Sequence, residues 1–192
     1  MEKIIYSALE DSIRVKKDFV KNNIANIIFL AKKIAEAFQK DNKLLLCGNG
    51  GSAADAQHIA AEFVNRFIIE RTPLPAIALT TDTSVITSIS NDYSFDQVFS
   101  KQISAIGRAG DILLAISTSG NSENVIRAIR TARDMGIYTA ALTGRDGGRM
   151  ARIADIPIIV KSNDTPRIQE SHIMAGHLIC QLVDHILFER NQ

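Results

Sequence analysis

One stretch limits what this chain can fold into more than any other. An apolar run over residues 43–47 stops at a glycine-rich loop, GNGGS at 48–52, and an alanine-rich helical pattern follows directly and reaches Glu62. This order predicts a buried strand, a tight loop and a helix. Glycines let the backbone approach a ligand closely, and the free N–H groups of a helix start attract anions. We expect an anion site with Ser52 capping the helix, although an ordinary turn fits too, because the G-x-G-x-x-G spacing is incomplete.

Two polar residues further along this helix pattern indicate chemistry near the loop. His58 and Glu62 are four residues apart, which places their side chains on one helix face. Such a pair can ligate a metal ion or transfer protons. A solvated ion pair is the alternative interpretation.

Four more apolar runs alternate with helical patterns along the chain. The clearest, within 111–116, has the continuous apolar character of a strand in a parallel sheet that is covered on both faces. We therefore predict an α/β fold with three layers, built on a doubly wound, five-stranded parallel sheet. The strands are expected near residues 44–47, 76–79, 111–116, 137–142 and 156–160.

A second polar loop follows the strand at 111–116. It reads STSGNS at 117–122 and precedes a helical pattern that begins at Glu123. Its hydroxyl groups and the helix N-terminus can hold a phosphate together, whereas a serine-rich loop with one helix cap is the alternative. Two such loops at the carboxyl ends of parallel strands favour a ligand site, because ligands bind at this edge of open α/β sheets.

Helical periodicity at both ends of the chain predicts helices beyond the sheet. Two N-terminal helices are expected, at about 2–20 and 23–39, and they either cover one sheet face or pack in part against a partner. In the C-terminal helix, Thr165 is the expected N-cap and Pro166 the first helical residue. The broad apolar surface of this helix predicts a bundle across a subunit interface. The chain is expected to form one domain, 1–192, with N-terminal helices at about 2–39, an α/β core at about 43–160 and a C-terminal helix at about 166–189.

The C-terminal helix carries polar residues that could serve a site. His177 follows Ala175 and Gly176, whose small side chains leave room for another backbone or a ligand. Gln169 lies eight residues earlier, which is about 12 Å along the helix axis. Both could reach one ion only by leaning toward each other or by coming from different subunits. A core or surface role is expected for His172 and His185.

Composition narrows the possible partners. Lys and Arg number 22 against 21 Asp and Glu, so no basic excess indicates binding to nucleic acid or to an anionic membrane. No apolar run approaches the length of a membrane span, and the N-terminus has no signal-peptide core. Cys47 and Cys180 lie among apolar residues, as free thiols do in a reducing compartment. We expect a cytoplasmic protein.

Taken together, five segments resemble the phosphoheptose isomerases, which are the sedoheptulose 7-phosphate isomerases of the sugar isomerase (SIS) fold, a flavodoxin-like arrangement. These segments occur in the family's order and cover nearly the whole chain. They are CGNGGSAADAQHIAAE, ISNDY, LLAISTSGNSENV, ALTGRDGG and RIQESHIMAGH.

The resemblance implies a reaction, a metal and an assembly. The family converts D-sedoheptulose 7-phosphate to D-glycero-D-manno-heptose 7-phosphate, for lipopolysaccharide and related glycans. It implies a homotetramer with a central helical bundle and active sites at subunit interfaces. It also implies one Zn²⁺ per site, and the matching ligand positions here are His58, Glu62, Gln169 and His177. Phosphate-binding and sugar-binding positions that match are Ser52, Ser117, Thr118, Ser119 and Ser122 for the phosphate, and Asn49, Gly50, Gly51, Asn91 and Asp92 for the sugar hydroxyls.

Aldose–ketose isomerisation through an enediol needs a base and an acid. Glu62 is the candidate base and His177 the candidate acid, although Glu62 cannot be a tightly bound ligand and a free base at the same instant. A similar, non-catalytic protein that binds the DnaA replication initiator is the rival interpretation, and an adaptor has no use for His58, Glu62 and His177 together. A sugar-phosphate-sensing regulator would need a DNA-binding segment, and no basic helix-turn-helix pattern is visible.

Overall fold

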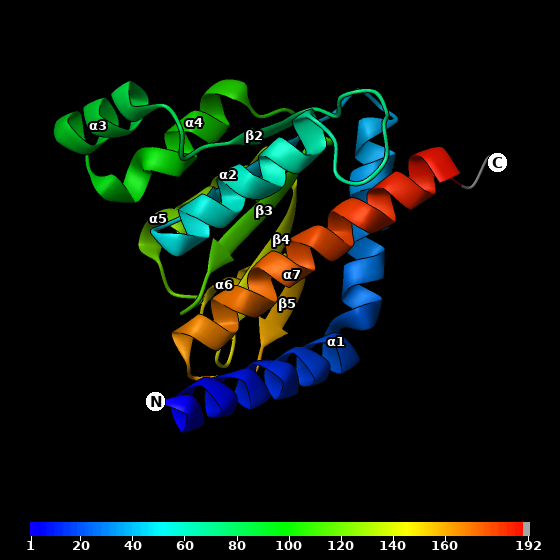
Figure 1. Ribbon diagram of the computed structural model, residues 1–192. Helices are drawn as coiled ribbons and strands as arrows, with labels where there is room; N and C mark the ends of the chain where they lie inside the picture. Colours follow the sequence, from blue (N-terminus) through cyan, green and yellow to red (C-terminus); the bar gives the residue numbers. More distant parts are fainter. Residues whose placement is uncertain (190–192) are drawn as a thin grey trace.

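The computed structural model describes residues 1–189, and the last three residues of the predicted domain 1–192 lie outside them. Five parallel strands form one sheet in the order β2-β1-β3-β4-β5, which confirms the predicted doubly wound α/β fold (Figure 1). All five strands fall within two residues of their predicted bounds. They are β1 Leu44–Gly48, β2 Ala76–Ala78, β3 Ile112–Ser117, β4 Tyr138–Gly144 and β5 Ile156–Val160.

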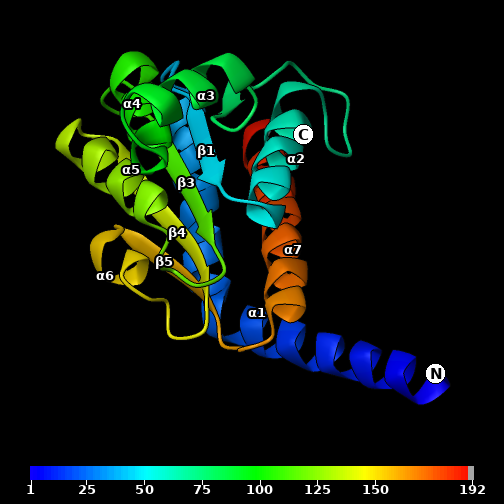
Figure 2. The same cartoon turned by 90° about the vertical axis from the view of Figure 1, so that its left-hand side faces the viewer.

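Helices cover both faces of the sheet, as Figure 2 shows. Helices α1 (Glu2–Phe38), α2 (Gly51–Val64) and α7 (Thr165–Asp184) pack on one face, and α7 continues into a π-helical turn, His185–Glu189. The opposite face carries α3 (Thr83–Asp92), a short 3-10 turn (Phe95–Gln97), α4 (Val98–Ile106), α5 (Glu123–Asp134) and α6 (Met150–Ile153).

Strand side chains alternate between the two faces. In β1, Leu44 and Leu46 face the layer of α1, α2 and α7, whereas Leu45 and Cys47 face α4 and α5. All four side chains are fully buried. This burial on both sides explains why the sequence of the strand is continuously apolar.

The N-terminal region corrects one prediction. The two helices expected at 2–20 and 23–39 form one continuous helix, α1, which changes direction partway along its length (Figure 1). Asn23, where the second helix was expected to begin, is buried and exchanges hydrogen bonds with the N–H and C=O of Ile159 on the edge strand β5. Asn26 likewise donates to the carbonyl of Pro157. The side-chain amides of Asn23 and Asn26, both on α1, thus supply hydrogen-bond partners to backbone groups on the free edge of the sheet.

The predicted N-cap residues of two helices are also wrong. Helix α2 begins at Gly51 with Gly50 as its N-cap, so Ser52 lies inside the first turn. Gly50 has φ +56°, a backbone conformation that residues with a side chain rarely adopt. The turn before the helix therefore falls at this glycine and not at Ser52. Helix α7 has Asp164 as its N-cap, because Thr165 already has helical geometry.

The first turns of α1 extend beyond the body of the protein (Figure 2). Five large apolar side chains here are more than half exposed, namely Met1, Ile4, Ile5, Tyr6 and Leu9. The later part of α1, from Val15 onward, has buried residues that pack on the core. The later part of α1 therefore covers the sheet, and its first turns lie off it; the packing of these turns against a partner stays a prediction. No helix within residues 1–189 has the length and apolar character needed to cross a bilayer.

Candidate functional site

Helices α2 and α7 lie side by side (Figure 1), and three predicted site residues on them come together. His58 Nε2 lies 2.9 Å from His177 Nε2 and 3.4 Å from Glu62 Oε1. One donor atom from each residue lies within 4.8 Å of the other two. The side chain of His58 is 48% exposed and that of Glu62 is 21% exposed, so the cluster is open to solvent on the side of His58. A single chain supplies all three residues.

A glycine on α7 explains the close approach of the two helices. A Cβ at Gly176 would lie 2.5 Å from Ile59 Cδ1 on α2, well inside van der Waals contact. The missing side chain therefore lets α7 bring His177 against His58, which are the neighbours of Gly176 and Ile59. Helix α2 fills the room that the sequence predicts beside His177.

Gln169 lies apart from this cluster. Its side-chain amide occupies the space where a Cβ of Gly51 would point, at the first turn of α2. Gly51 is seven residues from His58, which is about 10 Å along the helix. Within one chain, the structure thus brings together three of the four predicted metal ligands, and Gln169 lies beside the glycine loop.

The chemistry of the three clustered donors suits a divalent metal ion. Two imidazole nitrogens and a carboxylate oxygen form the protein ligands of tetrahedral zinc sites that keep a fourth position open. Ligands at about 2.1 Å from a tetrahedral ion stand roughly 3.4 Å apart. The separation of 3.4 Å between His58 Nε2 and Glu62 Oε1 matches this spacing, whereas the two histidine Nε2 atoms, 2.9 Å apart, would have to separate slightly around an ion. The residues present therefore fit such an ion.

The hydroxyl groups of the predicted phosphate loop converge at the end of β3. Ser117 Oγ lies 3.0 Å from Ser122 Oγ and 3.4 Å from Ser119 Oγ. Ser122 is the N-cap of α5, although its side chain makes no capping hydrogen bond. The hydroxyls and the positive end of the α5 dipole therefore lie together, as an anion site requires.

An amide pair connects this loop to the glycine loop. Asn49 and Asn124 each donate to the other's side-chain oxygen at 2.9 Å. Asn124 is buried in the first turn of α5, and the sequence interpretation did not include it. A polar residue just after an expected helix cap is the only signal that could have indicated it. A hollow of about 140 Å³ beside Asn49 and Gly50 is also lined by Ile86 and Phe95.

The predicted pair Asn91–Asp92 lies at the end of α3. Asn91 donates to Asp92 at 2.8 Å, and both residues are exposed. Within the part of the chain that the structure describes, neither side chain hydrogen-bonds to another predicted site residue. Their contact with a sugar stays a prediction.

Asp55, one turn before His58 on α2, was also missed by sequence reasoning. Burial raises the pKa of its carboxyl group to about 6, and the nearby His58 opposes part of this effect. Its Oδ2 atom is shielded and has no hydrogen-bond partner among the described residues. Aspartates are common in helices, so the sequence carried no signal for this one.

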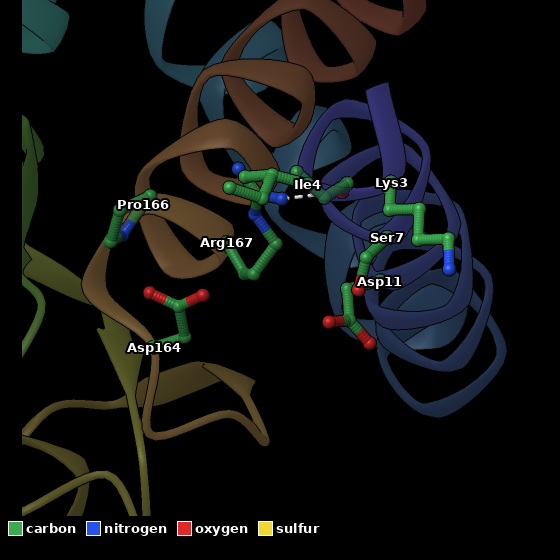
Figure 3. Close-up of a pocket in the computed structure, with 8 residues that line it drawn as sticks. Lys3, Ile4, Ser7, Asp11, Asp164, Pro166 and Arg167 are labelled. Atoms are coloured by element: carbon green, nitrogen blue, oxygen red, sulfur yellow. Dashed lines mark hydrogen bonds between the residues drawn. The ribbon is translucent and has the colours of Figure 1, made fainter. Parts of the chain in front are cut away.

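Another hollow lies away from all these residues. It measures about 580 Å³ and separates the first turns of α1 from the start of α7. Figure 3 shows Lys3, Asp11, Asp164 and Arg167 around it. Arg167 donates to the carbonyl of Ala8 across this gap, which fixes the N-terminal helix to α7. None of the predicted site residues lines it.

The chain is similar to known SIS-domain proteins in sequence and in structure. Residues 9–144 match the SIS domain family. The phosphoheptose isomerase of Nitratidesulfovibrio vulgaris Hildenborough is 54% identical over 97% of this chain and 90% of its own length. A phosphoheptose isomerase structure from Neisseria gonorrhoeae is 46% identical with a TM-score of 0.90, over 95% of this chain and 98% of that one. A second, from Francisella tularensis, is 40% identical with a TM-score of 0.92, over 95% and 97%.

Proposed function

The chain belongs to the phosphoheptose isomerase family of SIS-domain enzymes, and we propose that the site described above converts D-sedoheptulose 7-phosphate to D-glycero-D-manno-heptose 7-phosphate. The chain is an aldose–ketose isomerase, and its substrate is a sugar phosphate. The observation that carries this assignment is the convergence of His58, Glu62 and His177, because a protein that only binds a partner needs no such group. The DnaA-binding alternative is therefore not favoured.

The phosphate is proposed to bind at the start of α5. Ser117, Ser119 and Ser122 offer hydroxyl donors that already converge, and the helix dipole favours negative charge there. The Asn49–Asn124 amide pair holds the glycine loop beside this site. Further contacts to phosphate and sugar are proposed for Gly50, Gly51, Ser52, Asn91, Asp92, Thr118 and Gln169.

The reaction moves one proton from C1 to C2 of the sugar and another from O1 to O2. We propose that Glu62 removes and returns the carbon-bound proton, and that His177 moves the proton between the two oxygens. Both groups lie within hydrogen-bonding or near-hydrogen-bonding distance of His58, which supports their action on one substrate. A divalent ion, proposed to be Zn²⁺, would be held by His58 and His177, and by Glu62 whenever its carboxylate is not acting as the base; when bound, the ion would polarise the carbonyl group.

The assembly is proposed to be a homotetramer with a central helical bundle. The exposed apolar residues on the first turns of α1 support a contact with another copy. An apolar groove of about 380 Å³ between α1 and α7, lined by residues such as Ile24 and Leu182, supports it further. In such an assembly Gln169 of a second chain could complete the ligand set. A cytoplasmic location is proposed as well, and the buried free thiols Cys47 and Cys180 support it.

Turnover with a matched pair of variants tests this proposal. Purified protein incubated with sedoheptulose 7-phosphate should form the aldose, followed by NMR of the sugar protons. Glu62→Gln should reduce kcat by about 10²-fold or more, because it removes the base. Glu70→Gln, whose side chain is 87% exposed, should leave kcat unchanged. Equal activity of the two variants would contradict the assignment of Glu62.

A further inference from the structure

An aromatic side chain outside the predicted site contacts His177 directly. The ring of Phe67 stacks on the imidazole of His177, with centroids 5.4 Å apart and an interplanar angle of 28°. His58 meets the same imidazole edge to face, with centroids 5.1 Å apart and an angle of 62°. The imidazole of His177 therefore contacts two rings, that of the predicted metal ligand His58 and that of Phe67.

Phe67 lies on the loop between α2 and β2, which has no regular secondary structure. A buried ion pair anchors this loop, since Arg71 Nε lies 3.1 Å from Asp184 Oδ1 on α7 and both side chains are at least 95% buried. The Arg71 guanidinium also donates to the carbonyls of Glu62 and Phe63, at 2.9 and 2.6 Å. A cation at this end of α2 also complements the helix dipole.

The anchored loop thus contacts the backbone of Glu62, helix α7 and the ring of His177. Arg71 fixes the backbone of Glu62 and joins the loop to α7, the helix that carries His177. Phe67 then covers one face of the imidazole and packs against the main core cluster. Rotation of the His177 ring away from His58 would break the stacking with Phe67, so the loop favours the orientation in which Nε2 faces His58 and Glu62.

We propose that Phe67 is a positioning residue that holds the His177 imidazole in the orientation required for metal binding and proton transfer, with the Arg71–Asp184 ion pair as the anchor of its loop. This inference rests on the proposed function for its catalytic consequence, although the orientation of the ring is a property of the protein alone. Stacking of this kind favours one ring orientation by about 3- to 10-fold.

The test compares Phe67→Leu, which removes the ring, with Phe67→Tyr, which keeps it. Ile68→Ala is the matched control, because Ile68 is the next residue and its side chain is 62% exposed. The first measurement uses metal-free protein with isotope-labelled histidine, in which the carbon-bound ring protons of His177 are followed by NMR and assigned with His177→Gln. The second is Zn²⁺ affinity by competition with a chromophoric chelator, and the third is kcat and KM.

Phe67→Leu should shift the His177 ring protons toward their positions in a free imidazole, because the ring current of Phe67 is lost. It should also weaken Zn²⁺ binding and lower kcat by about 3- to 10-fold each, with KM unchanged. Phe67→Tyr should restore all three properties, and Ile68→Ala should resemble the unmodified protein. If Phe67→Leu does not fold, Phe67→Met supplies the same comparison with a different side chain of similar volume.

Two results would overturn the proposal. One is that Phe67→Leu leaves the His177 signals and Zn²⁺ affinity unchanged, and the other is that Ile68→Ala changes them equally. Failure of the proposed function looks different, because the unmodified protein would then lack turnover while the His177 signals and Zn²⁺ affinity still responded to loss of the Phe67 ring.

Discussion

His172 should make this protein lose stability in mild acid. Its imidazole lies on the buried side of α7, is fully buried and makes no hydrogen bond of good geometry to any of the described residues through either nitrogen. Burial lowers the pKa of His172 from 6.5 to about 4, and the backbone of Thr143 offsets only part of this effect. The folded protein therefore keeps His172 neutral under conditions in which the unfolded chain protonates it.

The sign and size of the effect follow from these two pKa values. Above pH 7 the group is neutral in both states and changes nothing. As the pH falls from about 6.5 to about 4, the unfolded state binds a proton that the folded state does not, so the free energy of unfolding decreases. The gap between the two pKa values corresponds to about 3 kcal/mol.

Urea denaturation from pH 7.5 to pH 4 measures this loss, with His172→Leu as the comparison. Asp55 and Asp184, whose pKa values are raised by burial, titrate in both proteins and cancel in the difference. The unmodified protein should lose about 3 kcal/mol more than the variant across this range, at one protein concentration. Parallel pH profiles, or a His172 imidazole that titrates near pH 6.5, would refute the reasoning.

Three further predictions concern the packing and the site. Gly176→Ala should weaken Zn²⁺ binding, measured by chelator competition, because the new Cβ pushes Ile59 and separates the two histidines. Ile59→Val should restore part of that affinity, and unchanged affinity in Gly176→Ala would exclude the close approach. Arg71→Leu should cost about 3–5 kcal/mol in urea denaturation by leaving Asp184 buried and unpaired, and a cost below about 1 kcal/mol would contradict this. Ser119→Ala should raise KM by about tenfold with kcat unchanged, because one phosphate donor is lost; an unchanged KM would remove Ser119 from the phosphate site.

The central fold could be predicted because its signals are local. Apolar runs mark all five strands within two residues, and three of the strands, β1, β3 and β4, end at a glycine or serine that marks the loop after the strand. The N-terminal break was predicted wrongly because the partners of Asn23 lie on β5, more than 130 residues away. Nothing in the local sequence shows that an amide has such a partner.

The site was predictable only in part for the same reason. The spacing of His58 and Glu62 placed them on one helix face, but only the resemblance to a family connected them with His177, 119 residues from His58. Asn124 and Phe67 went unnoticed because their roles depend on contacts with residues far away in the sequence, Asn49 and His177. The position of Gln169 beside Gly51 likewise follows from how α7 packs on α2.

One measurement tests the central claim most directly. Metal-stripped protein, and the same protein with Zn²⁺ restored, would be incubated with sedoheptulose 7-phosphate in deuterated buffer, and the sugar would be followed by NMR. The account predicts that the aldose forms with deuterium at C2 in the restored sample, and that its rate falls sharply in the stripped sample and in Glu62→Gln. Absence of aldose and of deuterium incorporation in folded, Zn²⁺-restored protein would contradict the assignment of this site as an isomerase.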